Sequence, residues 1–167
     1  MIYVDSTFYD ELYANDAIDD DAFSRLSRDA SKRMDRLTTG VDGVKKLTAA
    51  YPTDEDDIEA VKRCGAALIH TMLQIEQMEQ EQMEAARIVK QTDGTYQSAL
   101  VSSRSAGNES VSYASAGSLS KSSVIAAAVA DPLSREKLYR DTVTQYLSGV
   151  HDANGVNVLY MGRYPHV

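Results

Sequence analysis

Residues 53–88 read TDEDDIEAVKRCGAALIHTMLQIEQMEQEQMEAARI, and this stretch decides the fold. Its apolar residues recur at intervals of three and four, the spacing that places side chains on one face of an α-helix. That series comprises Ile58, Val61, Gly65, Leu68, Met72 and Ile75. Thr53 followed by Asp56 is a variant of the capping box that starts many helices. At 1.5 Å per residue, a helix of about 35 residues would be about 50 Å long. We expect its first half to lie in the core and its second half to be half exposed.

Two more segments have the same periodicity. Upstream, AFSRLSRDASKRMDRLT carries apolar residues from Phe23 to Leu37 at helical spacing, with aspartates before it and Gly40 after it. Downstream, the break at Asp131-Pro132 precedes a segment that runs to Ser148-Gly149 and predicts a third helix. The fold class that follows is mainly α, a small helical bundle of about three to four helices, one of them long.

Between the second and third helices the composition changes to Gly, Ser, Thr and Asn. Two short alternating runs flank Gly107-Asn108 and predict a protruding β-hairpin at about 98–115, which includes Val101, Val111 and Tyr113. An isolated hairpin is marginal in water, so it would need a body or a neighbouring chain to lie on. The following stretch, 118–130, could be a loop with a short helix or a longer segment that extends away from the domain. The role of Val124, Ile125 and Val129 is therefore left open.

The sequence finishes with VNVLYMGRYPHV, residues 156–167, after a turn at 152–155. Apolar and aromatic residues are unusual so near a terminus. They can complete the core of their own chain, or they can add a strand or an aromatic plug to a partner. Tyr160 and Tyr164 suit an interface because tyrosine buries a large area and keeps a hydroxyl for hydrogen bonding. We expect a helical domain at 1–149 and an extended C-terminal arm at 150–167, and composition alone leaves both roles of the arm open.

The chain is acidic, with 17 basic and 25 acidic residues and a net charge of −8. Residues 1–60 hold 15 acids and 7 bases, and 7 − 15 = −8, so the acidity lies in this part. Affinity for nucleic acid rests mainly on Lys and Arg that neutralise phosphates. The N-terminal part is therefore not expected to grip DNA.

No pattern typical of an enzyme or a metal site is present. Cys64 is the sole cysteine, which leaves no intramolecular disulfide and no CxxC zinc pattern. Cys64 and His70 do not converge on one helix, because six residues turn about 240° at 100° per residue. The aspartates at 16–21 and 54–57 lack the glycine and distal glutamate of a calcium loop and fit helix capping better. The methionines at 72, 78 and 83 fit packing at least as well as an adaptable binding surface. We expect no catalytic residue, cofactor or metal.

Signals for a membrane are also absent. The N-terminus has no basic region followed by a long apolar run, as a secretory signal would. The longest apolar run, SVIAAAVA at 123–130, is far shorter than the roughly 18 residues that a transmembrane helix requires. No membrane partner is expected.

Five segments, taken in order, resemble the head-tail connector, or adaptor, proteins of tailed bacteriophages. They are AFSRLSRDASKRMDRLT, VKRCGAALIHTML with its Glu/Gln-rich continuation, RSAGNESVSYAS, YRDTVTQYLSG and VNVLYMGRY. Single motifs are loose, and their order is the specific feature. The resemblance covers about residues 8–50, 55–115 and 134–164.

This resemblance implies a structural virion protein at the neck, made in the bacterial host cytoplasm. Such proteins form a ring, usually a dodecamer. The ring lies beneath the portal and joins it to the next neck protein, a head-closure or tail-terminator protein, while it continues the DNA channel. An acidic lining would let DNA pass without specific binding.

The resemblance also assigns residues. The portal-contacting arm would comprise Val158, Leu159, Tyr160, Met161 and Tyr164, and the hairpin used between subunits would comprise Val101, Val111 and Tyr113. The longer, more apolar 118–130 departs from the family pattern. The alternative function is a small helical protein-protein interaction module or regulator that dimerises through the Ile58–Ile75 heptad.

Overall fold

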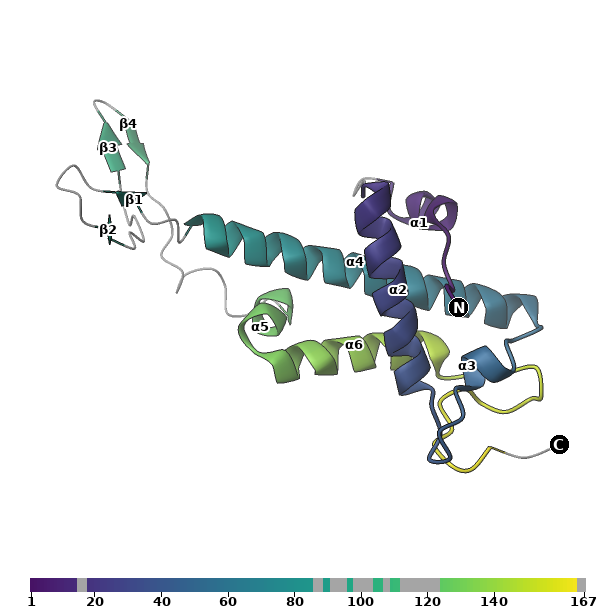
Figure 1. Cartoon of the computed structure of the whole chain (residues 1–167). Coiled ribbons are helices and arrows are strands. Elements are labelled where there is room, and N and C mark those ends of the chain that lie inside the picture. The colour runs from purple at the N-terminus through teal and green to yellow at the C-terminus, as the bar shows by residue number, and fades with distance from the viewer. Residues whose placement is uncertain are drawn as a thin grey trace. The chain divides into compact units, whose positions relative to one another are not determined.

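The computed structural model describes residues 1–14, 18–85, 89–90, 96–97, 104–106, 109–111 and 124–164. In these residues the chain is mainly helical, as predicted (Figure 1). The six helices of the described part are α1 (Ser6–Leu12), α2 (Asp20–Leu37), α3 (Lys46–Ala49), α4 (Glu55–Ala85), α5 (Val124–Ala130) and α6 (Pro132–Leu147). The predicted long helices correspond to α2, α4 and α6, whereas α1 and α3 were not predicted.

Aspartates define the starts of the two longest helices. Asp19 accepts a hydrogen bond from the Ala22 N–H at 2.8 Å and caps α2, with Asp20 and Asp21 in its first turn. Asp54, rather than the predicted Thr53, accepts from the N–H groups of Asp56 and Asp57 at the start of α4. The short side chain of aspartate lets its carboxylate reach the unpaired N–H groups of the first turn, which explains why aspartate caps both helices. The acidic residues also lie at the positive end of the helix dipole, where negative charge is favourable.

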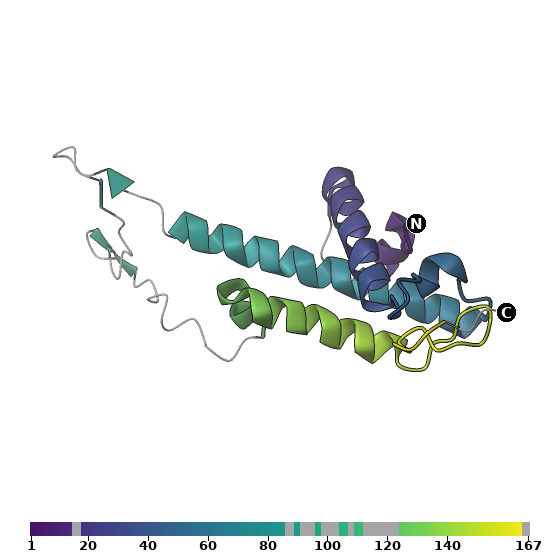
Figure 2. The same ribbon diagram turned by 60° about the horizontal axis from the view of Figure 1, so that its bottom comes forward.

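The chain divides into two compact units, residues 1–73 with 136–167 and residues 74–135, which differs from the predicted division at 149. In the first unit α2 crosses the first half of α4, and the C-terminal part of α6 lies beside that half (Figures 1 and 2). The unit's core is almost entirely apolar. Its buried residues include Tyr3, Val4, Tyr9, Phe23, Leu26, Ala30, Met34, Leu47, Val61, Cys64, Leu68, Met72, Tyr139, Val143, Leu147 and Val158.

The N-terminal residues form part of this core. Val4 lies against Gly65 of α4 so closely that a Cβ at Gly65 would overlap the Val4 side chain, and Met34 Sδ is 3.7 Å from the same point. Glycine at this position lets the N-terminal segment approach the helix backbone. On another side of the unit, Glu136 accepts hydrogen bonds at 2.5 Å from both Arg33 and Arg36, so α6 is joined to α2. Arg33 holds the pKa of Glu136 below its ordinary value.

The apolar series on α4, from Ile58 to Ile75, is the proposed dimer seam of the alternative function. Val61 and Leu68 are fully buried and Met72 is nearly so, and the side chains that cover this face belong to the same chain, including Val4 and Met34 beside Gly65. A coiled-coil seam must be open to a partner helix. Val61, Leu68 and Met72 of the predicted heptad are therefore core residues of this unit, whereas Ile58 is half-buried, and dimerisation through the Ile58–Ile75 heptad stays a prediction.

The second unit, residues 74–135, contains the end of α4 and α5. Arg135 binds Glu79 and donates from Nε to the Ala128 carbonyl at 2.9 Å. Asp131 caps α6 by accepting from the Ser134 N–H and hydroxyl at 2.9 and 2.8 Å, which lowers the pKa of its carboxyl. The short helix α5 resolves the ambiguity over 118–130 in favour of a helix for its described part.

Two short antiparallel strand pairs are also present in the second unit. The first joins β1 (Val89–Lys90) to β2 (Tyr96–Gln97), and the second joins β3 (Arg104–Ala106) to β4 (Glu109–Val111) with Ser105 opposite Ser110. Val101 and Tyr113 lie outside the described residues. The protruding hairpin at 98–115 and its role between subunits therefore stay predictions.

Candidate interaction surface

The C-terminal segment, residues 150–164, folds back on its own unit, beside α3 and the loop after α2 (Figures 1 and 2). Val158 N–H donates to the Val150 carbonyl at 3.0 Å and Asp152 N–H donates to the Val156 carbonyl at 2.9 Å. The predicted turn is confirmed, because Gly155 N–H donates to the Asp152 carbonyl at 2.9 Å with a φ of 73°. The expectation of an extended arm is thereby corrected for these residues.

A buried lysine joins this segment to the rest of the unit. Lys46, the first residue of α3, has no exposed surface. Its Nζ donates to the carbonyl oxygens of Val158 at 3.4 Å and Thr38 at 3.5 Å, and to that of Tyr160. A buried ammonium must be hydrogen bonded, since removing it from water is costly. The three carbonyls meet that requirement and tie two distant parts of the chain to one group.

The charge of Lys46 is balanced at longer range. Burial lowers the pKa of Lys46, and the carboxylates of Asp42 and Asp152 act in the opposite direction. These two aspartates also hold the segment directly. Asp42 Oδ2 accepts from the Tyr164 N–H at 2.6 Å, and Asp152, itself buried, accepts at Oδ1 from the N–H groups of Asn154 and Val156 at 2.9 Å.

Tyr164 completes the polar contacts of the segment. Its hydroxyl donates to Asp152 Oδ2 at 2.5 Å and accepts from Asn154 Nδ2 at 2.7 Å. Burial and the bond to Asp152 raise the pKa of Tyr164. The predicted contact residue Tyr164 therefore uses its hydroxyl within its own chain.

The loop after α2 packs on the segment from the other side. A Cβ at Gly40 would lie 3.0 Å from the Gly162 carbonyl oxygen, so the two backbones approach closely there. The Val41 N–H donates to the Met161 carbonyl at 3.2 Å. This bond brings the backbone of the loop beside the backbone of the segment.

Three apolar side chains remain exposed at this place. Val41 is 77% exposed, Tyr160 is 52% exposed and Met161 is 50% exposed. We call these three residues the C-terminal surface. Large exposed apolar side chains that gather on a held backbone are a feature of protein interaction sites. These three side chains are therefore the candidates for contact with another protein.

Four of the five predicted arm residues separate into two groups, whereas the fifth, Tyr164, is half-buried and uses its hydroxyl within its own chain. Val158 is fully buried by its own chain and is not available to a partner, which corrects its assignment, and Leu159 is half-buried. Tyr160 and Met161 are exposed and remain candidates. Sequence analysis missed Val41 and Lys46, because an isolated valine in a loop and one of two adjacent lysines carry no periodic signal.

Other candidate groups do not form a site in the described part of the chain. Cys64 is fully buried, and burial raises the pKa of its thiol to about 12, so the nucleophilic thiolate is not formed near neutral pH. His70 stacks on Tyr13 with ring centroids 4.2 Å apart. Within the residues that the structure describes, no cluster of three or more His, Cys, Asp or Glu side chains could hold a metal ion. None of the described helices is both long and apolar enough to cross a membrane.

Comparison of the chain with protein-family models, with curated proteins and with solved structures finds no match.

Proposed function

We propose that this protein is a structural head-tail adaptor of a tailed-phage virion, which forms a ring under the portal and joins it to the next neck or tail protein. The observation that carries the proposal is the C-terminal surface. It lies in the segment whose sequence, VNVLYMGRY, resembles the portal-contacting end of such adaptors, and it exposes two of the predicted contact residues, Tyr160 and Met161.

The anchoring of this segment supports a binding role. Association is weakened by the entropy lost when flexible side chains and loops become ordered. Here Lys46 holds the carbonyls of Val158 and Tyr160, and Asp42 holds the Tyr164 N–H, so the aromatic and thioether side chains are presented without ordering a free tail. Tyrosine and methionine are enriched in the cores of protein interfaces. The portal is the proposed partner of this surface.

The charge of the chain supports the proposed DNA channel. With a net charge of −8, the protein repels the duplex at long range and provides few phosphate contacts. DNA can then move past the ring without being held. No cofactor, metal or chemical step is part of this function.

Substitution at the surface is a sharper test than removal of the segment. Truncation after Gly155 would remove the buried Val158 and two carbonyl partners of Lys46, so the domain itself would lose stability. The double variant Tyr160→Ser/Met161→Ser changes only half-exposed side chains. The matched control is Leu133→Ser, which changes an apolar side chain that is 79% exposed in the other unit.

The measurement is co-sedimentation of each full-length variant with portal rings, together with circular dichroism to verify the fold. We expect the double variant to fold and to lose portal binding by at least about tenfold, since removal of interface anchors commonly costs 1 kcal/mol or more each. The control should bind like wild type. Unchanged binding of a folded double variant would remove the C-terminal surface from the proposed interface.

A further inference from the structure

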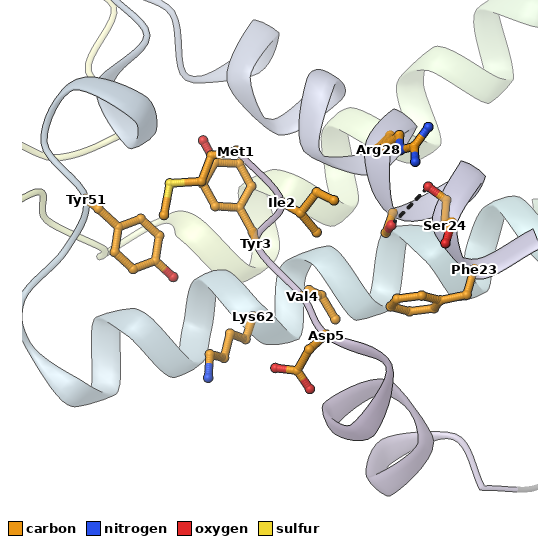
Figure 3. A pocket seen from close by; sticks show the side chains of 11 residues that line it. Met1, Ile2, Tyr3, Val4, Asp5, Phe23, Ser24, Arg28, Tyr51 and Lys62 are labelled. Atoms are coloured by element: carbon orange, nitrogen blue, oxygen red, sulfur yellow. Dashed lines mark hydrogen bonds between the residues drawn. The ribbon is translucent and has the colours of Figure 1, made fainter. Parts of the chain in front are cut away.

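A second feature of the first unit lies away from the C-terminal surface. Around the N-terminal residues there is an open hollow of about 530 Å³, which we call the N-terminal hollow (Figure 3). It is lined by Met1, Ile2, Tyr3, Val4, Asp5, Phe23, Ser24, Ser27, Arg28, Tyr51 and Lys62. Figure 3 shows Arg28 and Ser24 on one side of the N-terminal residues, and Tyr51 and Lys62 on the other.

The apolar part of the hollow has a buried floor and an exposed lip. Tyr3 and Val4 are each 4% exposed, and the Tyr3 ring stacks on Tyr51 with centroids 5.9 Å apart. Met1 and Ile2, in contrast, are 68% and 52% exposed at the lip. An occupant of this hollow would therefore cover exposed apolar surface above a packed floor.

Two cations stand at the hollow, and no described carboxylate pairs with either of them. Among the described residues, neither Arg28 nor Lys62 forms an ion pair, and Lys62 Nζ lies 5.6 Å from the centre of the Phe8 ring. The one carboxylate of the lining, Asp5, already accepts from the Phe8 N–H at 2.9 Å as the cap of α1. In a chain with a net charge of −8, two such cations beside apolar surface favour an occupant that is both acidic and apolar.

This chain itself carries such a segment on α1. Asp10 and Glu11 are exposed, their side chains form no ion pair in the described part of the structure, and the next residue, Leu12, is 39% exposed. We call Asp10, Glu11 and Leu12 the acidic edge. The other exposed leucine near an acid, Leu133, is a poorer match, because the Asp131 carboxylate beside it is already bound to Ser134.

We propose that the N-terminal hollow of one copy receives the acidic edge of a second copy. The two carboxylates face Arg28 and Lys62, and Leu12 covers the apolar lip at Met1 and Ile2. When each copy gives its edge to the hollow of the next copy, the contact is head-to-tail, the kind that closes into a ring when the rotation between copies permits. This inference rests on the proposed ring-forming function and assigns a surface to the contact between subunits.

Charge reversal tests this pairing. One full-length variant carries Asp10→Lys/Glu11→Lys, and a second carries Arg28→Glu/Lys62→Glu. Each places like charges on both sides of the contact, and we expect self-association to weaken at least about tenfold at low salt. An equimolar mixture should regain wild-type association, because each reversed edge then meets a reversed hollow. The matched control, Lys137→Glu/Arg140→Glu, changes two exposed cations on α6 and should associate like wild type.

Sedimentation velocity, with circular dichroism to verify folding, gives the readout. A wild-type chain that stays monomeric at several hundred micromolar would overturn the inference, and so would a mixture that associates no better than its components. Portal binding, measured on the same chains, distinguishes failure of the proposed function from failure of this inference. Restored pairing in a chain that does not bind portal rings would sustain the inference and reject the portal partner. Portal binding without restoration in the mixture would sustain the portal partner and reject the inference.

Discussion

At the scale of single residues, Lys46 determines how the C-terminal segment is held. A lysine that is fully buried usually pairs with a carboxylate, but here its hydrogen bonds go to main-chain carbonyls. Carbonyl acceptors leave the group dependent on Asp42 and Asp152 for charge balance. The C-terminal surface therefore depends on a residue that does not itself touch a partner.

Replacement of this lysine should loosen the segment. Lys46→Met keeps the apolar stem but removes the donor to the Val158 and Tyr160 carbonyls, and an unsatisfied buried polar group costs about 1–3 kcal/mol. Urea denaturation should report a loss of that size, and amide hydrogen exchange should quicken in residues 150–164. The neighbouring, exposed Lys45→Met provides the control and should change neither quantity. Equal exchange rates in the two variants would contradict the role given to Lys46.

Because of Tyr3, the free energy of unfolding should depend on pH in the alkaline range. Its hydroxyl donates to Asp35 Oδ1 at 2.5 Å, and burial, followed by this bond, raises the pKa of Tyr3 well above its ordinary value. A tyrosine with a raised pKa in the folded state contributes stability fully below the unfolded pKa of about 10, and loses it as pH rises further. We expect the free energy of unfolding to fall above pH 10, by up to about 1.4 kcal/mol per pH unit from this group.

The variant Tyr3→Phe isolates that contribution. It should cost about 0.5–1.5 kcal/mol at neutral pH for the lost hydrogen bond, and should flatten the decline above pH 10. Asp35→Asn, which keeps the phenol but removes the neighbouring charge, should flatten the decline only in part. Urea denaturation between pH 8 and about 11.5 measures both. A slope as steep in Tyr3→Phe as in wild type would assign the alkaline sensitivity to other groups.

At the scale of elements, the contact of the N-terminal residues with α4 depends on Gly65. In Gly65→Ala the new methyl group overlaps Val4, a steric cost of about 1–3 kcal/mol, partly offset by the helix propensity of alanine, about 1 kcal/mol. We expect a net loss of stability in thermal or urea denaturation. Gly149→Ala is the control, since no atom lies within 4 Å of its Cβ position.

A second substitution tests the steric explanation. In the double variant Gly65→Ala/Val4→Ala the smaller side chain makes room for the methyl group, so the two losses should be less than additive. Additive losses would mean that Val4 is not the group displaced.

Periodicity predicted the elements that bury one continuous face, and it missed those that do not. In α2 the residues Phe23, Leu26, Ala30 and Met34 are buried at the predicted spacings. The short helices α1 and α3 have 7 and 4 residues, too few to repeat a pattern. Their positions depend on contacts made by residues distant in sequence, such as the carbonyls that Lys46 reaches on the C-terminal segment.

The candidate surface was predictable only in part for a similar reason. The sequence marked Tyr160 and Met161 as unusual, and both are exposed, yet the same reasoning placed the buried Val158 with them. Alternation along a short segment does not tell which face another part of the chain will cover. Val41 joins them through a backbone hydrogen bond to Met161, which no side-chain pattern encodes.

At the scale of the whole molecule, the net charge predicts weak affinity for DNA. Proteins that bind duplex DNA non-specifically do so with Kd values of about 10⁻⁴ to 10⁻⁶ M at physiological salt through several phosphate contacts. With a net charge of −8, this protein should give no fluorescence anisotropy change with a labelled duplex at up to about 10 µM protein. Binding that weakens steeply as salt increases would reveal a local basic surface and contradict a channel that releases DNA.

The division of the first unit also has a consequence for synthesis on the ribosome. Its core joins residues 1–73 to residues 136–167, with the second unit inserted between them. Val158 and Tyr160, whose carbonyls bind Lys46, are thus translated after all the described helices of the first unit. At about 5–20 residues per second, α2 and the first half of α4 wait several seconds with their apolar faces uncovered. Nascent chains stalled before residue 136 should therefore depend on chaperones, whereas chains that have emerged past residue 164 should not.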